Sequence, residues 1–127
     1  MRHVWTLTLR WIPKAPAATS PVLYRACVSK NETPMTRWYW QQVGGLLIEE
    51  FTMVKRSLTN APRYLDGLIV LGEPTAIAES RAFDIAGRDV IAVQAKAKRL
   101  GMMVMGQCLV SRELLLAMGP RSVRSVA

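Results

Sequence analysis

Histidine and cysteine are scarce in this 127-residue chain, which has only His3, Cys27 and Cys108. The two cysteines lie far apart, no CxxC pair occurs, and no histidine is near either cysteine. The sequence therefore argues against a zinc site and against a Cys–His or Ser–His nucleophile pair. So few cysteines indicate a reducing, cytoplasmic setting.

Long apolar runs are absent, and acidic residues are few. No apolar run approaches the roughly 18–20 residues that a membrane-spanning helix needs, and no secretory apolar region follows Arg2 and His3. We therefore expect a cytoplasmic protein with no membrane partner. Only 9 acidic residues stand against 17 basic ones, and the formal net charge of +8 permits binding of a polyanion without identifying one.

Residues 1–34 differ in composition from the rest. They contain several prolines, a short alternation of apolar and polar residues near the start, and a single acidic residue, Glu32. We interpret them as a basic N-terminal extension that is weakly ordered or forms a short strand and a loop. Residues 35–127 are then the folded domain. An organelle transit peptide is an alternative interpretation of the extension.

Half of the residues are hydrophobic, enough for one domain with one core. Apolar spacing and the Gly119-Pro120 stop signal predict an α/β fold in the order helix, strand, strand, helix, strand. The predicted elements are a helix over Met35–Arg56, a strand over Leu65–Leu71, a strand within Asp89–Lys98, a helix over Met102–Met118 and a strand over Ser122–Ala127.

Each predicted element except the last carries polar residues on a face that should be buried. Glu50 lies in an apolar helical stripe, Asp66 opens a strand before Gly67, and Gln107 lies in the stripe of the second helix. Gln94 and Lys96 share one face of the strand DVIAVQAKAK, because residues two apart point the same way.

Glu50, Asp66 and Gln94 can also be explained locally, without a shared site. Glu50 would then form an ion pair with Arg37 or Lys55 at the edge of its stripe. Asp66 would be a turn residue, and the strand would simply leave the core at Gln94. A shared site explains the set more economically than separate accidents do.

The chemistry of the set is coherent. Asp66 and Glu50 supply carboxylate ligands for a hard divalent cation, Gln94 adds a neutral oxygen, and water completes the shell. Lys96 would orient or deprotonate a water and stabilise charge on a phosphate oxygen. These are the requirements of metal-assisted phosphodiester hydrolysis.

These residues resemble the PD-(D/E)XK nuclease superfamily, the restriction-endonuclease-like fold. The matching elements are Glu50 on the first helix, Leu65-Asp66 on a strand, Gln94-Ala95-Lys96 on the next strand and Gln107 on the following helix. The resemblance covers residues 36–127, with 27 residues between Asp66 and Gln94. It implies an αβββαβ core with a mixed central sheet flanked by helices, dependence on Mg²⁺ with Mn²⁺ as a substitute, and DNA as the substrate.

Two positions depart from the superfamily pattern. Leu65 replaces the proline, and Gln94 replaces the acidic residue of the (D/E)XK pair. Glutamine also occurs there in active branches similar to VRR-NUC nucleases. The loss of one negative charge weakens metal binding and favours a site for one metal ion. The first strand of the αβββαβ core has no place in the predicted elements except residues 56–64.

The leading hypothesis is a Mg²⁺-dependent DNA endonuclease that uses water as its nucleophile. A catalytically inactive module of the same fold that binds DNA or a protein partner is the alternative, and an unrelated structural or interaction domain is a third. Lys98, Arg99 and Arg63 are the candidate DNA-binding residues, although they also suit a solvated face. Because a 90-residue nuclease core presents little DNA-binding surface, we expect a homodimer or a larger complex.

Overall fold

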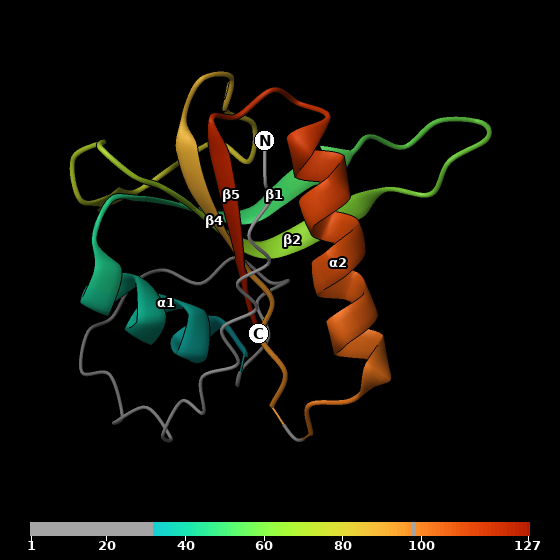
Figure 1. Ribbon diagram of the computed structural model, residues 1–127, viewed down its shortest axis with the longest axis horizontal. Helices are drawn as coiled ribbons and strands as arrows, with labels where there is room; N and C mark the ends of the chain where they lie inside the picture. Colours follow the sequence, from blue (N-terminus) through green and yellow to red (C-terminus); the bar gives the residue numbers. More distant parts are fainter. Residues whose placement is uncertain (1–31, 98) are drawn as a thin grey trace, which may run out of the picture.

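The computed structural model describes residues 32–97 and 99–127, and within them a five-stranded mixed sheet is flanked by two helices (Figure 1). The elements are α1 (Glu32–Val43), β1 (Leu46–Val54), β2 (Arg63–Val70), β3 (Ala76–Ile77), β4 (Asp89–Val93), α2 (Met102–Leu116) and β5 (Ser122–Val126). The α/β class predicted from the sequence is confirmed.

The strands are arranged in the order β3-β1-β2-β4-β5. β2 runs antiparallel to both of its neighbours, β1 and β4, whereas β5 runs parallel to β4 and β3 runs parallel to β1. Parallel strands need a crossover connection, and α2 supplies it between β4 and β5. The two helices lie on opposite sides of the sheet (Figure 1).

The core has two parts because the sheet is covered on both faces. Val90 and Ala92 belong to the cluster that includes Leu115 of α2, and Ile91 and Val93 belong to the cluster on the α1 side. This is the alternation expected of a buried strand. The prediction that Asp89–Lys98 contains a central strand is therefore confirmed, with β4 itself ending at Val93.

The predicted helix over Met35–Arg56 is wrong in its second half, where β1 forms instead. Gly44 and Gly45 have φ angles of 78° and 86°, a conformation that ends a helix and that glycine adopts without strain. A Cβ on Gly45 would lie 2.6 Å from the carbonyl oxygen of Val70. The glycines therefore separate a helix from a strand, and β1 is the first strand that the sequence left without a place.

The start of the domain also differs from the prediction. α1 begins at Glu32, so the boundary drawn at residue 34 falls inside this helix. The rest of the predicted extension lies outside the described residues. Glu32 in the first turn and Pro34 close behind it are typical of a helix start, since the carboxylate complements the helix dipole and proline suits the first turn.

The later elements lie close to their predicted positions, but the orientation of α2 differs. The sequence predicts a buried stripe through Met103, Gln107, Val110 and Leu114, but the first three are exposed and Leu114 is half-buried. The buried residues of α2 are instead Val104, Cys108, Ser111 and Leu115. The buried stripe is one residue further along, which corresponds to a rotation of about 100° about the helix axis.

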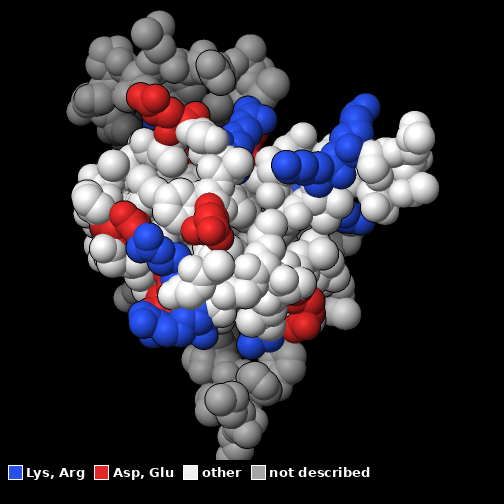
Figure 2. Space-filling model, turned by 90° about the horizontal axis from the view of Figure 1, so that it is seen from above, with Lys and Arg blue, Asp and Glu red and all other residues white. Residues whose placement is uncertain are grey.

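Basic side chains are spread over several parts of the surface, including the loop that projects between β1 and β2 (Figure 2). Neither helix in the described part of the chain is both long enough and apolar enough to span a bilayer.

Candidate active site

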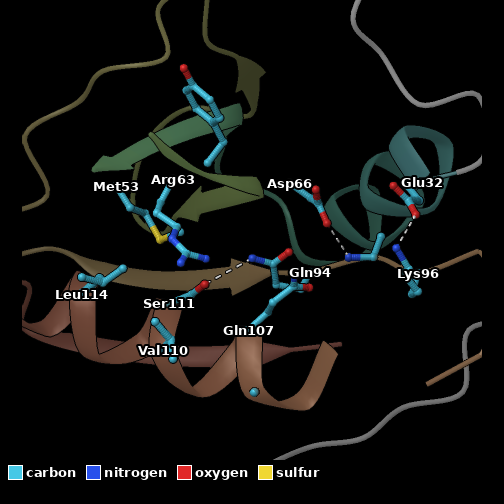
Figure 3. Close-up of a pocket in the computed structure, with 13 residues that line it drawn as sticks. Glu32, Met53, Arg63, Asp66, Gln94, Lys96, Gln107, Val110, Ser111 and Leu114 are labelled. Carbon is cyan, nitrogen blue, oxygen red and sulfur yellow. Dashed lines mark hydrogen bonds and ion pairs between the residues drawn. The ribbon is translucent and has the colours of Figure 1, made fainter. Parts of the chain in front are cut away.

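A pocket of about 360 Å³ lies between α2 and the ends of β2 and β4 (Figure 3). Four of the five predicted catalytic residues line it: Asp66, Gln94, Lys96 and Gln107. The pairing of Gly67 with Val93 places Asp66, in the middle of β2, beside Gln94, which directly follows β4. Asp66 and Gln94, 28 positions apart in the chain, are therefore brought together by the sheet.

Asp66 is partly buried, and burial raises the pKa of its carboxyl group. The backbone N–H of Ala95 opposes this shift by donating a hydrogen bond of 2.9 Å to Oδ2. The negative charge of Glu32 raises the pKa of Asp66 further, while Lys96 lowers it. The carboxylate is thus incompletely compensated by the protein, and a bound cation would stabilise its ionised form.

Gln94 is only 8% exposed, and its orientation is set by α2. Its Nε2 donates a buried hydrogen bond of 3.2 Å to Oγ of Ser111. The carbonyl oxygen then points away from Ser111, toward Asp66 (Figure 3). This oxygen is a suitable neutral ligand for a hard cation. Ser111 was missed by the sequence reasoning because the buried stripe of α2 was placed one residue too early.

Lys96 lies beyond the end of β4, where its ammonium group reaches the pocket from a half-exposed position. Its Nζ is 3.8 Å from Oε1 of Glu32, which also lines the pocket (Figure 3). Glu32 is the acidic residue that α1 contributes to the site. Sequence reasoning missed it because residues 1–34 were interpreted as an N-terminal extension, although Glu-Thr-Pro is also a signal for a helix start.

Glu50 does not have the position predicted for it. It lies on β1, not on a helix, and its Oε2 is 2.5 Å from the guanidinium of Arg81. It is not among the residues that line the pocket. The neighbouring Glu49 accepts hydrogen bonds from Arg37 of α1. The structure therefore does not bring Glu50 into the pocket with Asp66, and the acidic residue that α1 places there is Glu32.

A local irregularity explains the position of Glu50. Its φ angle is 49°, and it lies between Ile48 and Phe51, which both belong to the core cluster on the α2 side. Strand residues three apart point to opposite faces in a regular strand. The backbone at Glu49–Glu50 therefore departs from the regular pleat, which no helical periodicity would reveal.

The three predicted DNA-binding residues lie in different places relative to the pocket. Arg63 lines the pocket, Arg99 is exposed beyond it, and Lys98 lies outside the described residues. Gln107 is on the exposed side of α2 and still reaches the pocket.

Within residues 32–97 and 99–127, no cluster of three or more His, Cys, Asp and Glu side chains forms a metal-binding group. The donor set is instead the carboxylate of Asp66 and the amide oxygen of Gln94, with Glu32 lining the same pocket. Mg²⁺ is commonly bound through one or two carboxylates, with waters and substrate phosphates completing its shell. The residues present fit that mode of binding.

Comparisons of the chain with protein-family models, with curated proteins and with solved structures find no match. The function is therefore argued from the pocket and its residues.

Proposed function

We propose that this protein is a Mg²⁺-dependent nuclease that hydrolyses phosphodiester bonds in DNA. The observation that carries the proposal is the convergence of Asp66, Gln94 and Lys96 from adjacent strands on one pocket. An aspartate, an oxygen donor and an ammonium group in one place match the requirements of phosphoryl transfer to water.

The element order supports a restriction-endonuclease-like core. When the two-residue strand β3 is set aside as an addition to the sheet edge, the described chain reads αβββαβ, with β2 antiparallel to β1 and β4, and with β5 parallel to β4. In this interpretation Asp66 is the aspartate of the signature, and Gln94-Ala95-Lys96 occupies the (D/E)XK position.

Each pocket residue has a distinct role in the proposed reaction. Asp66 and Gln94 hold the cation through oxygen atoms, and the hydrogen bonds from Ala95 and to Ser111 hold these two side chains in place. When bound, Mg²⁺ supplies a Lewis acid that polarises water and a phosphate oxygen.

The remaining groups act on the water and the phosphate. Lys96 orients the attacking water and balances the negative charge that grows on the phosphate in the transition state. Glu32, 3.8 Å from the Lys96 ammonium, restricts where that flexible side chain points. The Gln107 amide is placed to hydrogen-bond the phosphate or the water.

Cleavage of supercoiled plasmid DNA with Mg²⁺ or Mn²⁺ tests the proposal. Asp66→Asn and Lys96→Ala should each lower the rate by about 100-fold or more, the usual cost of removing one group that stabilises transition-state charge. Glu50→Gln is the matched control, because it removes a carboxylate that lies outside the pocket, and it should retain cleavage. Circular dichroism should show that all three variants are folded.

Equal cleavage by wild-type protein and Asp66→Asn would contradict the assignment of this pocket. Gln94→Glu restores the acidic residue of the superfamily pattern. Since it adds a negative ligand beside Asp66, it should lower the Mg²⁺ concentration needed for half-maximal cleavage.

A catalytically inactive DNA-binding module is the second candidate. The neutral side chain of Gln94 favours it, because one carboxylate fewer faces the cation. This candidate predicts salt-sensitive binding of DNA without cleavage under any of the metal conditions.

A further inference from the structure

The loop between β1 and β2 projects from the body of the molecule as an arm, which we define as residues 55–62 (Figure 1). Its tip is an ordered turn. Ser57 donates its backbone N–H to the carbonyl oxygen of Asn60 at 3.0 Å, and the N–H of Asn60 donates to Oγ of Ser57 at 3.0 Å. The N–H of Thr59 also donates to this Oγ, at 3.3 Å.

This turn holds Leu58 at its apex, where the side chain is fully exposed (107%). The position adds nothing to the stability of the domain, because no apolar surface is removed from water there. Burial of such a side chain against a partner is favourable. The apex therefore presents an apolar group, on a hydrogen-bonded support, to whatever approaches the arm.

The charge of the arm indicates the kind of partner. Lys55 and Arg56 precede the turn and Arg63 follows it, while residues 51–65 contain no acidic side chain. Figure 2 shows basic side chains on this projecting part of the molecule. A positive arm with an apolar tip suits a polyanion that also offers apolar faces, which is the chemistry of nucleic-acid phosphates and bases.

The arm is also continuous with the candidate active site. Arg63 and Tyr64, at the start of β2, line the pocket that contains Asp66. Tyr64 is half exposed, with 50% of its surface accessible, so one face of its ring can stack on a base. A strand rises about 3.3 Å per residue, so Leu58 lies at most about 20 Å from Tyr64.

We propose that the arm recognises the junction between double-stranded and single-stranded DNA. Lys55 and Arg56 contact the backbone, Leu58 packs as a wedge against the last base pair, and Tyr64 stacks on an unpaired base beside the pocket. Apolar wedges cost unstacking energy in continuous duplex, and that cost is least where the bases are already unpaired. The inference rests on the proposed function in taking DNA as the substrate, and it names branched DNA as the substrate class.

Binding without cleavage tests the proposal. Fluorescence anisotropy in EDTA compares a fork with non-complementary tails and a fully paired duplex of the same length. The wild-type protein should bind the fork about tenfold tighter, because the Leu58 wedge must unstack base pairs in continuous duplex but not where the bases are already unpaired. Leu58→Ser should remove most of this preference and leave duplex binding unchanged.

The basic residues of the arm should affect DNA binding in a different way from Leu58. The double variant Lys55→Ala/Arg56→Ala should weaken binding to both DNAs equally and reduce the slope of log K against log salt by about 2. Leu109→Ser, at an exposed apolar position on α2, and Arg88→Ala, at the other end of β4 from Gln94, are the matched controls. Neither control should change the preference for the fork.

A 2-aminopurine placed at the last base pair of the fork reports the wedge directly. Its fluorescence should rise when the wild-type protein binds and should not rise with Leu58→Ser. A fork preference that survives Leu58→Ser would overturn the proposal, as would the absence of any preference in the wild-type protein. A change of oligomeric state in Leu58→Ser, seen by light scattering with DNA binding intact, would instead identify the arm as a protein contact and also overturn it.

These outcomes are distinguishable from failure of the proposed function. Fork binding that depends on Leu58, without cleavage in Mg²⁺ or Mn²⁺, would support the arm and contradict the nuclease. Cleavage that depends on Asp66 but not on the arm would support the nuclease and contradict the proposed role of the arm. If the arm and the pocket act together, the cut should lie within about six base pairs of the fork, given about 3.4 Å per base pair.

Discussion

Asp66 is the residue at which stability and the proposed chemistry conflict. Burial raises the pKa of its carboxyl group, which means that the folded protein binds the Asp66 proton more tightly than the unfolded chain does. A carboxyl group must be ionised to bind a metal ion in the proposed way. The ionised carboxylate of Asp66 therefore lowers the stability of the metal-free protein, and it is useful only when a cation is bound.

This conflict predicts a pH dependence. The stability contributed by Asp66 is fully present below its ordinary pKa of about 4 and is lost as the pH rises through the raised value. Asp66→Asn keeps an acceptor for the Ala95 N–H and removes the ionisation. The free energy of unfolding of wild type minus that of Asp66→Asn should therefore fall as the pH rises above about 4, which urea denaturation can measure.

The size of this fall in stability depends on how far the pKa of Asp66 is raised. Each unit of elevation of the pKa costs about 1.4 kcal/mol at neutral pH, and partial solvent exposure lowers the effect. Asp66→Asn is thus expected to be at least as stable as the wild type at pH 7 in EDTA. A wild-type protein that becomes more stable than Asp66→Asn as the pH rises would contradict the assigned burial of this carboxyl group.

At the scale of elements, the position of α1 depends on the absence of a side chain at Gly67. A Cβ built there would lie 2.5 Å from Cγ2 of Thr36, which is buried in α1. Gly67 directly follows Asp66, and α1 carries Glu32 into the same pocket. Close approach of helix and strand therefore brings the two acidic residues together.

Gly67→Ala should destabilise the domain by about 1–3 kcal/mol, the usual cost of overpacking. Thr36→Ser removes the clashing methyl group and retains the hydroxyl that donates to the carbonyl oxygen of Glu32. Alone it should cost about 1 kcal/mol for the lost buried methyl group. In the Gly67→Ala background it should instead restore stability, and urea denaturation of the four proteins gives the coupling free energy. Additive effects would show that α1 does not pack on Gly67 in this way.

At the scale of the whole molecule, metal binding should be visible as folding stability. A ligand that binds only the folded state at 100 times its Kd stabilises that state by about 2.7 kcal/mol. For a domain of this size, this corresponds to a rise in Tm of roughly 10 °C or more. We expect Mn²⁺ to produce this shift in the wild type and in Glu50→Gln, and to produce little shift in Asp66→Asn. Equal shifts in all three proteins would place the ion elsewhere.

The elements that could be predicted from the sequence are those with a clear local signal. β2, β4, α2 and β5 each lie close to their predicted ranges, because apolar alternation and the Gly119-Pro120 stop depend on neighbours in the chain. That Gln94 and Lys96 lie near each other was also predictable, since side chains two residues apart in a strand share a face, whereas their placement beside Asp66 was implied by the resemblance and by no local pattern.

The errors all arose where local patterns were ambiguous. Leu47, Phe51 and Val54 fit a helical period in the sequence, yet they lie on a strand whose pleat is irregular at Glu49–Glu50. Gly44 and Gly45 lie inside the predicted helix, but they form the turn that ends α1. Once β1 was mistaken for helix, Glu50 was placed on the wrong element and Glu32 was left outside the domain.

The sequence by itself determined the α/β class, most of the strands and the polar residues of the central strand, because these depend on side-chain period and turn chemistry. Only the tertiary structure decided which acidic residue joins them. Glu32 and Lys96 meet across 64 positions of the chain because α1 packs against Gly67, and Ser111 orients Gln94 because of the rotation of α2. Contacts of this kind depend on packing between distant elements, which no local period encodes.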